Sequence, residues 1–301
     1  MIKNLKSLVL IMIFSCSLLL LFGCSEKKDA ESQYEPFIID VVNDVTNIKP
    51  ELTMWNQEYF EREDVDKEKE VSFDDRTYKG KYTKSIIRKG ESYTTDIYTD
   101  DKGVKIGFKE NTDKLVLLNL MNNEFFDKEP FKDDIKNAEQ SALSLAKNIA
   151  SKYVNVNEYE ILQEEPVTRE KNKDEMKYYI TYYTFTFVKK VNDVYSSDYL
   201  SVKITSKGNL ASLYIGDLNV FDNVKKIDFS VEDINKVNSE KILDTYKSLG
   251  HEVLEQSISY QRLVITPEGK LALYSGIDIK LKLNGDEKII ESGICILSYI
   301  K

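Results

Sequence analysis

The chain has 301 residues and a formal net charge of −9 at pH 7. An apolar fraction of 42%, with many tyrosines and phenylalanines, indicates a globular protein long enough to bury one large core or several small ones. The acidic balance argues against nucleic acid as a partner and against attachment to anionic lipid through charge.

The first 24 residues have the pattern of an export signal. Lys3 and Lys6 precede an apolar run over residues 8–22. At about 15 residues this run is short for a spanning helix, which needs roughly 20. It closes on a four-residue motif, Leu21-Phe22-Gly23-Cys24.

This motif resembles the lipobox of lipoprotein precursors in Gram-positive bacteria, although a small or medium residue is usual at Phe22. The resemblance implies a signal peptide over residues 1–23, diacylglycerol (with palmitate among its acyl chains) on the Cys24 thiol and a lipid anchor in the cell membrane. Two or more acyl chains hold a protein stably on a bilayer. The mature chain is then expected on the extracellular side. A plain signal peptide or an uncleaved signal anchor is the alternative.

Beyond the lipid site, the composition divides the chain into a tether and three units. Residues 24–33 are polar and predict a flexible tether. Units are predicted at residues 34–125, 130–220 and 228–301. The expected fold class is α+β, with tandem units of one helix packed on an antiparallel meander sheet of three or four strands.

The first unit begins with an apolar stripe at helical spacing over residues 37–45. Residues 52–60 predict a short helix or a loop, and the charged stretch 61–75 predicts a solvated loop. Alternating apolar residues and glycine turns then predict four antiparallel strands, over residues 81–88, 92–99, 104–108 and 115–120.

The second unit starts with apolar and small residues on one helical face: Ile135, Ala138, Ala142, Leu145, Ile149 and Tyr153. A charged loop is predicted over residues 164–175. Strands are predicted over residues 159–163, 177–190, 195–205 and 210–215, with a turn at Asn192-Asp193 between the second and the third.

The third unit repeats this order. Ser230 is placed to cap a helix that Gly250 ends. Strands are predicted over residues 257–265, 270–283 and 288–300. In the second of these strands, Leu271 and its alternate neighbours are expected to face inward, and Tyr274 is expected to face outward.

The order of helix, strand and glycine-linked strand pair resembles the PepSY-like units of secreted Gram-positive proteins. The stretches that carry this resemblance are residues 138–150, 197–210 and 265–274. It implies a non-catalytic extracytoplasmic module of the kind attached to peptidases or envelope sensors. A second resemblance is to membrane-attached accessory proteins that restrain sensor kinases.

The residues of common catalytic sites are scarce in this sequence. The single histidine, His251, follows a predicted helix end, and Cys295 lies in an apolar run that predicts a buried thiol. No phosphate loop, dinucleotide fingerprint or zinc-binding pattern is present, so neither a cofactor nor a metal is expected. Paired carboxylates in turns leave open an enzyme that uses only carboxylates.

One strand has the composition of a binding surface. Tyr178, Ile180 and Tyr182 alternate on one face of the predicted strand 177–190, opposite an apolar face. Tyrosine suits protein or glycan contacts because its ring is rigid and its hydroxyl stays hydrated. Packing of this face against an adjoining unit is the alternative.

The sequence therefore predicts a membrane-anchored extracytoplasmic lipoprotein that binds or regulates an envelope protein without catalysis. The alternatives are a carboxylate-dependent enzyme acting on cell-wall polymer and an accessory regulator of a sensor kinase.

Overall fold

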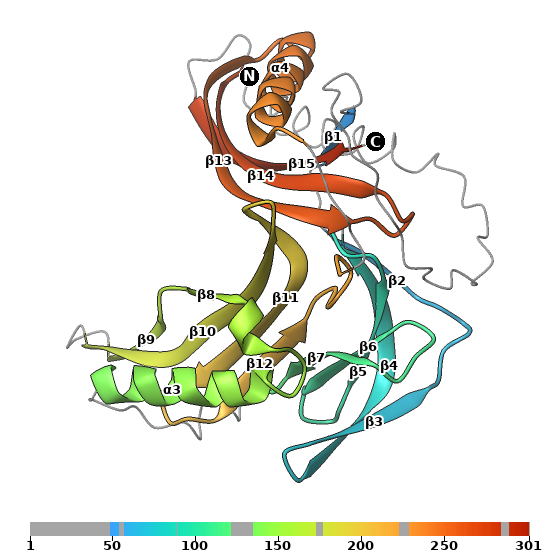
Figure 1. Cartoon of the computed structure of the whole chain (residues 1–301), viewed down its shortest axis with the longest axis vertical. Coiled ribbons are helices and arrows are strands. Elements are labelled where there is room, and N and C mark those ends of the chain that lie inside the picture. Colours follow the sequence, from blue (N-terminus) through green and yellow to red (C-terminus); the bar gives the residue numbers. More distant parts are fainter. Residues whose placement is uncertain are drawn as a thin grey trace, which may run out of the picture. The chain divides into compact units, whose positions relative to one another are not determined.

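The computed structural model describes residues 49–53, 57–88, 90–121, 135–172, 177–222, 229–283 and 289–300. All of them belong to one compact unit, Ile38–Lys301. The residues described hold two α-helices and one long series of strands (Figure 1). The predicted helix over residues 37–45 and the predicted lipidation site Cys24 lie outside these ranges.

The first strands come from the N-terminal third of the chain. They are β1 (Lys49–Thr53), β2 (Gln57–Phe60), β3 (Glu68–Phe73), β4 (Arg76–Arg88), β5 (Thr94–Thr99), β6 (Lys105–Lys109) and β7 (Leu115–Asn119). The middle third holds α3 (Ile135–Ala150), a short 3₁₀ turn (Val156–Glu158), β8 (Glu160–Gln163), β9 (Val167–Asn172), β10 (Lys177–Val191), β11 (Val194–Thr205) and β12 (Leu210–Ile215). The last third holds α4 (Val231–Ser248), β13 (Glu252–Ile265), β14 (Leu271–Lys282) and β15 (Ile289–Tyr299).

These strands form one connected sheet of 15 strands, in the order β1-β15-β14-β13-β11-β12-β7-β6-β5-β4-β2. Strand β10 pairs with β11, β8 and β9, and β3 pairs with β4. The predicted fold class, tandem helix-on-meander units, is therefore wrong. Antiparallel β12–β7 pairs and one parallel β11–β13 pair join strands that the prediction had assigned to different units.

The physical reason for the error is that alternation of apolar residues identifies a strand but not its neighbours. An edge strand presents unpaired backbone groups, and pairing it with another strand satisfies them. Strand β7 pairs with β12 through residues such as Leu118↔Leu213, so each of these two strands covers the outer edge of the other.

Helix α3 forms because small and apolar residues recur on one face, as the sequence predicts. Its buried residues are mostly alanines, including Ala142 and Ala146, which let the helix approach the sheet closely. The opposing residues Tyr183, Phe185 and Phe187 of β10 are fully buried. Figure 1 shows α3 lying along β10 and β11, which is the main core of this part of the molecule.

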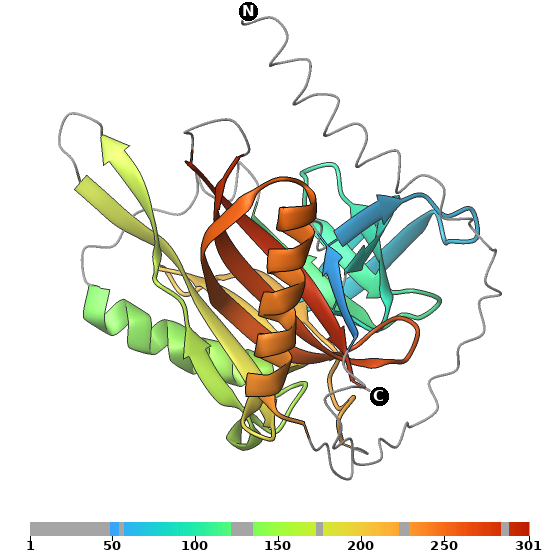
Figure 2. The same ribbon diagram turned by 90° about the horizontal axis from the view of Figure 1, so that it is seen from above.

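Helix α4 begins where predicted, and the Ser230 side chain accepts a hydrogen bond from the Asp233 N–H at 3.1 Å. Its buried residues Ile234 and Ile242 face β13–β15. Figure 2 shows the helix crossing these strands on one side. Strand β15 pairs with β14 on one side and with β1 on the other.

Tight turns fix the register of several hairpins. Asp74 and Asp75 both have positive φ, 46° and 60°, between β3 and β4. The predicted turn at Asn192 and Asp193 is confirmed, with φ values of 50° and 63° between β10 and β11. Short Asx residues tolerate this left-handed conformation, and two in succession match the twist of a hairpin.

Several local predictions need correction. Residues 52–60 contribute to β1 and β2, and the two charged stretches predicted as loops contain β3 and β9. Because their residues are mostly charged, the sequence pattern did not indicate these two short strands. Within the described ranges, β3 pairs with β4 and β9 pairs with β10.

Tyr274, predicted to face outward, is 1% exposed. A Cβ atom on Gly90 would lie 3.4 Å from Val264 and 3.6 Å from Tyr274, so the β4–β5 turn covers this face of β14.

Candidate functional site

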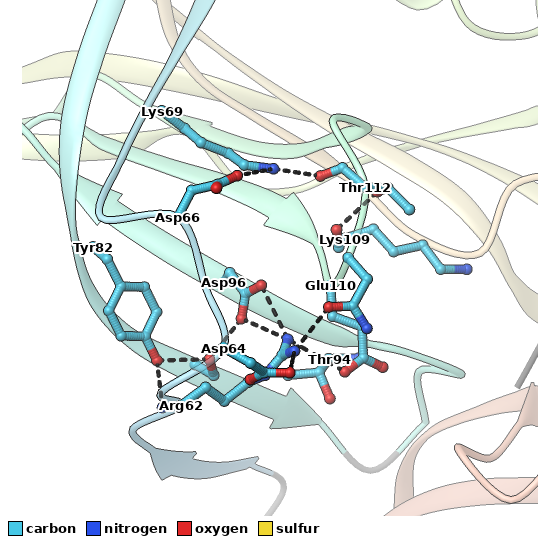
Figure 3. Close-up of polar contacts among 12 residues, drawn as sticks. Arg62, Asp64, Asp66, Lys69, Tyr82, Thr94, Asp96, Lys109, Glu110 and Thr112 are labelled. Atoms are coloured by element: carbon cyan, nitrogen blue, oxygen red, sulfur yellow. Dashed lines mark hydrogen bonds and ion pairs between the residues drawn. The ribbon is translucent and has the colours of Figure 1, made fainter. Parts of the chain in front are cut away.

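Within the ranges described, two polar clusters and the partly unpaired strand β13 could carry function; β1, β2, β3, β8 and β9 are also paired on one side only. The first cluster surrounds Arg62, in the segment between β2 and β3 (Figure 3). Its guanidinium donates to Asp64 at 3.0 Å, to Asp96 at 3.2 Å and to Asn111 at 2.8 Å. Glu110 forms a further ion pair at 3.6 Å.

The Arg62 cluster continues into the sheet through hydroxyl groups. Ser85 donates to Asp96 at 2.6 Å, and the Tyr82 hydroxyl lies 2.9 Å from the Ser85 hydroxyl. The Arg62 backbone N–H donates to Tyr82 at 3.0 Å. Each of these groups has a partner within the protein. We therefore interpret the cluster as structural: it holds the β2–β3 segment against β4, β5 and the β6–β7 turn.

The second cluster, which we call the junction cluster, contains two buried carboxyl groups. Glu91, in the β4–β5 turn, is 2% exposed, and Asp217, after β12, is 6% exposed. Arg88 forms an ion pair with Glu91 at 3.3 Å, and Tyr214 donates to the same carboxylate. The Ser92 N–H donates to Asp217 at 2.9 Å.

Burial dominates the titration of both carboxyl groups. Loss of hydration raises the pKa of Glu91 to about 7, against the opposing effect of the nearby Arg88 charge. Burial likewise raises the pKa of Asp217 to about 6, while hydrogen bonds from Ser92 act in the other direction. Repulsion between the two carboxylates adds to the rise in the pKa of Glu91. The junction cluster thus holds two carboxyl groups that change charge near neutral pH.

Aromatic and cationic side chains extend from the junction cluster across five strands. We call this series the Tyr/Arg ladder; its members are Arg88, Tyr214, Tyr199, Arg262, Tyr274 and Tyr260. Arg88 lies 5.0 Å from the centroid of the Tyr214 ring, and the Tyr214 and Tyr199 centroids are 5.8 Å apart. Arg262 lies 5.3 Å from the Tyr199 centroid and 5.5 Å from that of Tyr274.

The ladder reaches solvent at Tyr260, which is 43% exposed and whose ring centroid lies 5.7 Å from that of Tyr274. Tyr260 lies over Gly276 on the neighbouring strand β14, where a Cβ atom would overlap its ring. Glycine is therefore required at this position for the tyrosine to lie flat on the sheet. Cation–π and aromatic contacts of this kind stabilise by about 0.5–2 kcal/mol each.

Strand β13 is open along much of one side. Strand β14 pairs with it from Glu252 to Ile265, whereas β11 contributes one parallel pair, Ser196↔Leu263. Within the ranges described, no strand pairs with this side between Glu252 and Gln261. We call this stretch the open side of β13.

The sequence-predicted binding residues lie on β10. Tyr178 and Ile180 pair with Glu170 and Thr168 of β9, and their side chains lie outside the described part of the structure. Tyr182 is half-buried, and Lys203 Nζ lies 5.2 Å from its ring centroid. Strand alternation places Tyr182 on the face opposite the buried Tyr183. The binding role of this trio stays a prediction.

The two residues considered for nucleophilic chemistry are engaged locally. The Tyr274 hydroxyl donates to the Cys295 sulfur at 3.1 Å, and the thiol is partly buried rather than fully buried as the sequence predicts. The backbone N–H of His251 donates to the backbone carbonyl of Tyr246 at 2.9 Å, at the end of α4.

Within the described ranges, the structure holds no group of three or more His, Cys, Asp or Glu side chains that could bind a metal ion. Neither α3 nor α4 combines the length and the apolar character that crossing a bilayer requires.

Sequence reasoning missed Glu91, Asp217, Arg88 and Arg262. The only local signal was an acidic residue next to a glycine turn, Gly90-Glu91, which is typical of a solvated turn. Its burial results from contact between turns and strands far apart in sequence, which no local pattern shows.

Comparisons of the chain with protein-family models, with curated protein sequences and with solved structures found no match.

Proposed function

We propose that the chain is a lipid-anchored extracytoplasmic module that binds another protein of the cell envelope without catalysing a reaction. Its attachment rests on the lipobox-like motif that ends in Cys24, and its binding role rests on the open side of β13. That strand carries exposed apolar side chains next to unpaired backbone, which is the combination that strand-addition interfaces use.

The observation that carries the proposal is the exposure of Leu254, Ile258 and Tyr260. Their exposed fractions are 39%, 44% and 43%, and they lie within seven residues of one strand. Single exposed apolar residues are ordinary, but a group on an unpaired strand marks a contact surface or an aggregation hazard. An anchored protein that is retained at the membrane would use such a surface for a partner.

Membrane fractionation and crosslinking from intact membranes test both parts of the proposal. Cys24→Ser should release the chain from the membrane fraction, with its mass checked for an uncleaved precursor. Leu254→Lys/Ile258→Lys should lose the crosslinked partner, whereas Tyr178→Ala/Tyr182→Ala tests the predicted face on β10. Ile289→Lys, at another exposed apolar residue on β15, is the matched control. Unchanged partner recovery in both double variants would contradict the proposal.

A second candidate function is favoured by the junction cluster. A carboxyl group whose pKa lies near 7 can act as a general acid at neutral pH, and Glu91 meets that condition beside a second carboxyl group. This arrangement supports a carboxylate-dependent hydrolase of wall polymer.

The hydrolase ranks second because Glu91 and Asp217 are buried and already bonded to internal donors. Release of fragments from purified cell wall by the native chain, abolished in Glu91→Gln, would establish the enzyme and displace the binding proposal. Equal absence of products with both chains would leave binding as the function.

A further inference from the structure

We propose that the open side of β13 accepts an extended strand from a partner protein, and that this strand alternates basic and apolar residues. This inference rests on the proposed binding function and specifies its surface and its partner. The argument proceeds from backbone pairing, then exposed apolar side chains, then charge.

Backbone pairing defines where a strand could be added. Among the described residues, β13 is paired from Glu252 to Tyr260 with β14 on one side only. Parallel pairing with β11 is confined to Leu263, near the other end of the strand. Backbone N–H and C=O groups on the open side can therefore form a new ladder with an extended peptide.

Side chains on this stretch supply apolar contacts next to the backbone. Leu254, Ile258 and Tyr260 are exposed, and Tyr260 is fixed over Gly276 by its packing on Tyr274. A ring held in place loses little conformational freedom when a partner covers it. In the pairing with β14, Ile258 lies opposite Ile277 and Tyr260 lies opposite Gly276, so these two side chains lie on opposite faces of the sheet. An apolar residue of an added strand would cover Ile258, on the face that carries α4.

Charge identifies the other positions of the partner strand. Glu252 and Glu255 lie on this stretch, and the Glu255 side chain is 75% exposed. Glu255 forms an ion pair of 3.9 Å with Lys280 of the neighbouring strand β14, and Glu252 lies opposite Lys282 of the same strand. No cationic residue occurs on β13 before Arg262, so basic side chains on the added strand would complement this surface.

The same charges argue against a second copy of the chain as the occupant. Each copy carries a net charge of −9 and brings the same two glutamates to the shared edge. Two chains with the same negative net charge repel each other at long range. A basic partner avoids this repulsion and gains from long-range attraction to an acidic protein.

Two bulges limit the length of the contact. Register shifts occur between Val253 and Glu255 and between Ile258 and Tyr260. Bulges increase the local twist and interrupt continuous pairing, which protects an exposed edge from indiscriminate aggregation. The regular segment between them, Glu255–Ile258, is where the added strand should pair, so a short partner segment is expected.

Amide hydrogen exchange of the mature chain with defined peptides tests this inference. The probe is an acetylated, amidated seven-residue peptide of alternating lysine and valine. Controls are a peptide with glutamate in place of lysine and a lysine–valine peptide with alternate backbone nitrogens methylated. The basic peptide should slow exchange of β13 amides around Glu255–Ile258, and neither control should do so.

Variants separate this site from non-specific adsorption. Ile258→Lys should weaken binding of the basic peptide by about tenfold or more, as expected when an apolar contact is replaced by a charge on the edge strand. Ile289→Lys should bind as the native chain does. Exchange that does not change in β13, or equal binding of the glutamate peptide, would overturn the inference.

Sedimentation of the peptide-free chain tests whether a second copy of the chain occupies the open side of β13. A dimer that protects β13 and is lost in Ile258→Lys would assign the open side to a second copy and overturn the basic partner. The peptides could fail to bind while the Leu254→Lys/Ile258→Lys variant still loses its crosslinked partner. That result would refute the basic, alternating partner strand but not the binding function. Failure of both would refute the binding function.

Discussion

The part of the sheet that packs on α3 and the part that packs on α4 have similar sequence patterns but different neighbouring strands. Helix α3 lies on β10 and β11, and β11 is paired on both sides, with β10 and β12. Helix α4 lies on β13–β15, where β13 has an open side. The same local order of helix and hairpin strands thus yields one region in which β11 is paired on both sides and one in which β13 is open on one side.

The two helix–sheet contacts also differ in chemistry. Alanines of α3 meet the large rings of β10, which gives an apolar core. Helix α4 uses polar contacts as well: Ser298 donates to Asn238 at 2.6 Å, and Gln261 donates to Asn235 at 2.7 Å. Buried hydrogen bonds fix the position of a helix while adding less stability than apolar packing. We infer that the α3 region supplies stability and the α4 region supplies a positioned surface.

The largest effect should follow from opening the α3 core. Phe185→Ala removes a fully buried ring, and such a change costs about 3–5 kcal/mol of unfolding free energy. Urea unfolding measures this loss. Tyr59→Ala, at a side chain 52% exposed, is the control and should stay within about 0.5 kcal/mol. A loss below 1 kcal/mol in Phe185→Ala would contradict the assignment of the main core to this region.

Glu91 should make the link between the regions sensitive to pH. Its folded-state pKa of about 7 exceeds the ordinary value of 4.5, so the folded chain holds the proton more tightly than the unfolded chain. The contribution of Glu91 therefore favours folding increasingly as pH falls from about 7 to 4.5, and it is constant outside that window. The full difference is on the order of 3 kcal/mol.

Glu91→Gln isolates this contribution from that of other carboxyl groups. The difference in unfolding free energy between the native chain and the variant should change across pH 4.5–7 with the stated sign. Urea unfolding at several pH values measures it. A difference that is independent of pH would show that Glu91 titrates normally and is not buried in the junction cluster.

A smaller effect is expected from the polar contact beneath α4. Asn238→Ala leaves the buried Ser298 hydroxyl without its partner, which costs about 1–3 kcal/mol. Adding Ser298→Ala should recover part of this loss, because the unpaired hydroxyl is removed. Additive losses in a double-mutant cycle would indicate that the two side chains do not interact.

The sequence was a good guide to single elements and a poor guide to their pairing. Helices α3 and α4 were predicted from apolar residues such as Ala142 and Ile242, and the turn at Asn192-Asp193 from its residue types. These signals act over a few residues. The pairs Leu118↔Leu213 and Ser196↔Leu263 join distant strands, and any alternating strand could have taken either place.

The candidate sites show the same division. Glu91 and Asp217 are buried because the turn after β4 meets the end of β12, and the charge of Arg262 on β13 opposes the rise in the pKa of Glu91. Ile258 lies in a predicted strand and Leu254 lies just before it, and the exposure of both depends on the neighbour that β13 lacks within the described ranges. Cys24 could be proposed as a lipidation site from the sequence because a lipobox-like motif is local.

Site-specific photo-crosslinking in intact cells tests the binding surface most directly. A photoreactive phenylalanine analogue replaces Ile258 in one strain and Ile289 in another, and adducts are analysed after irradiation. The proposed function predicts a discrete adduct from position 258 alone, joined to a partner segment that alternates basic and apolar residues. No adduct from position 258, equal adducts from both positions, or an adduct only to a second copy of the chain would contradict it.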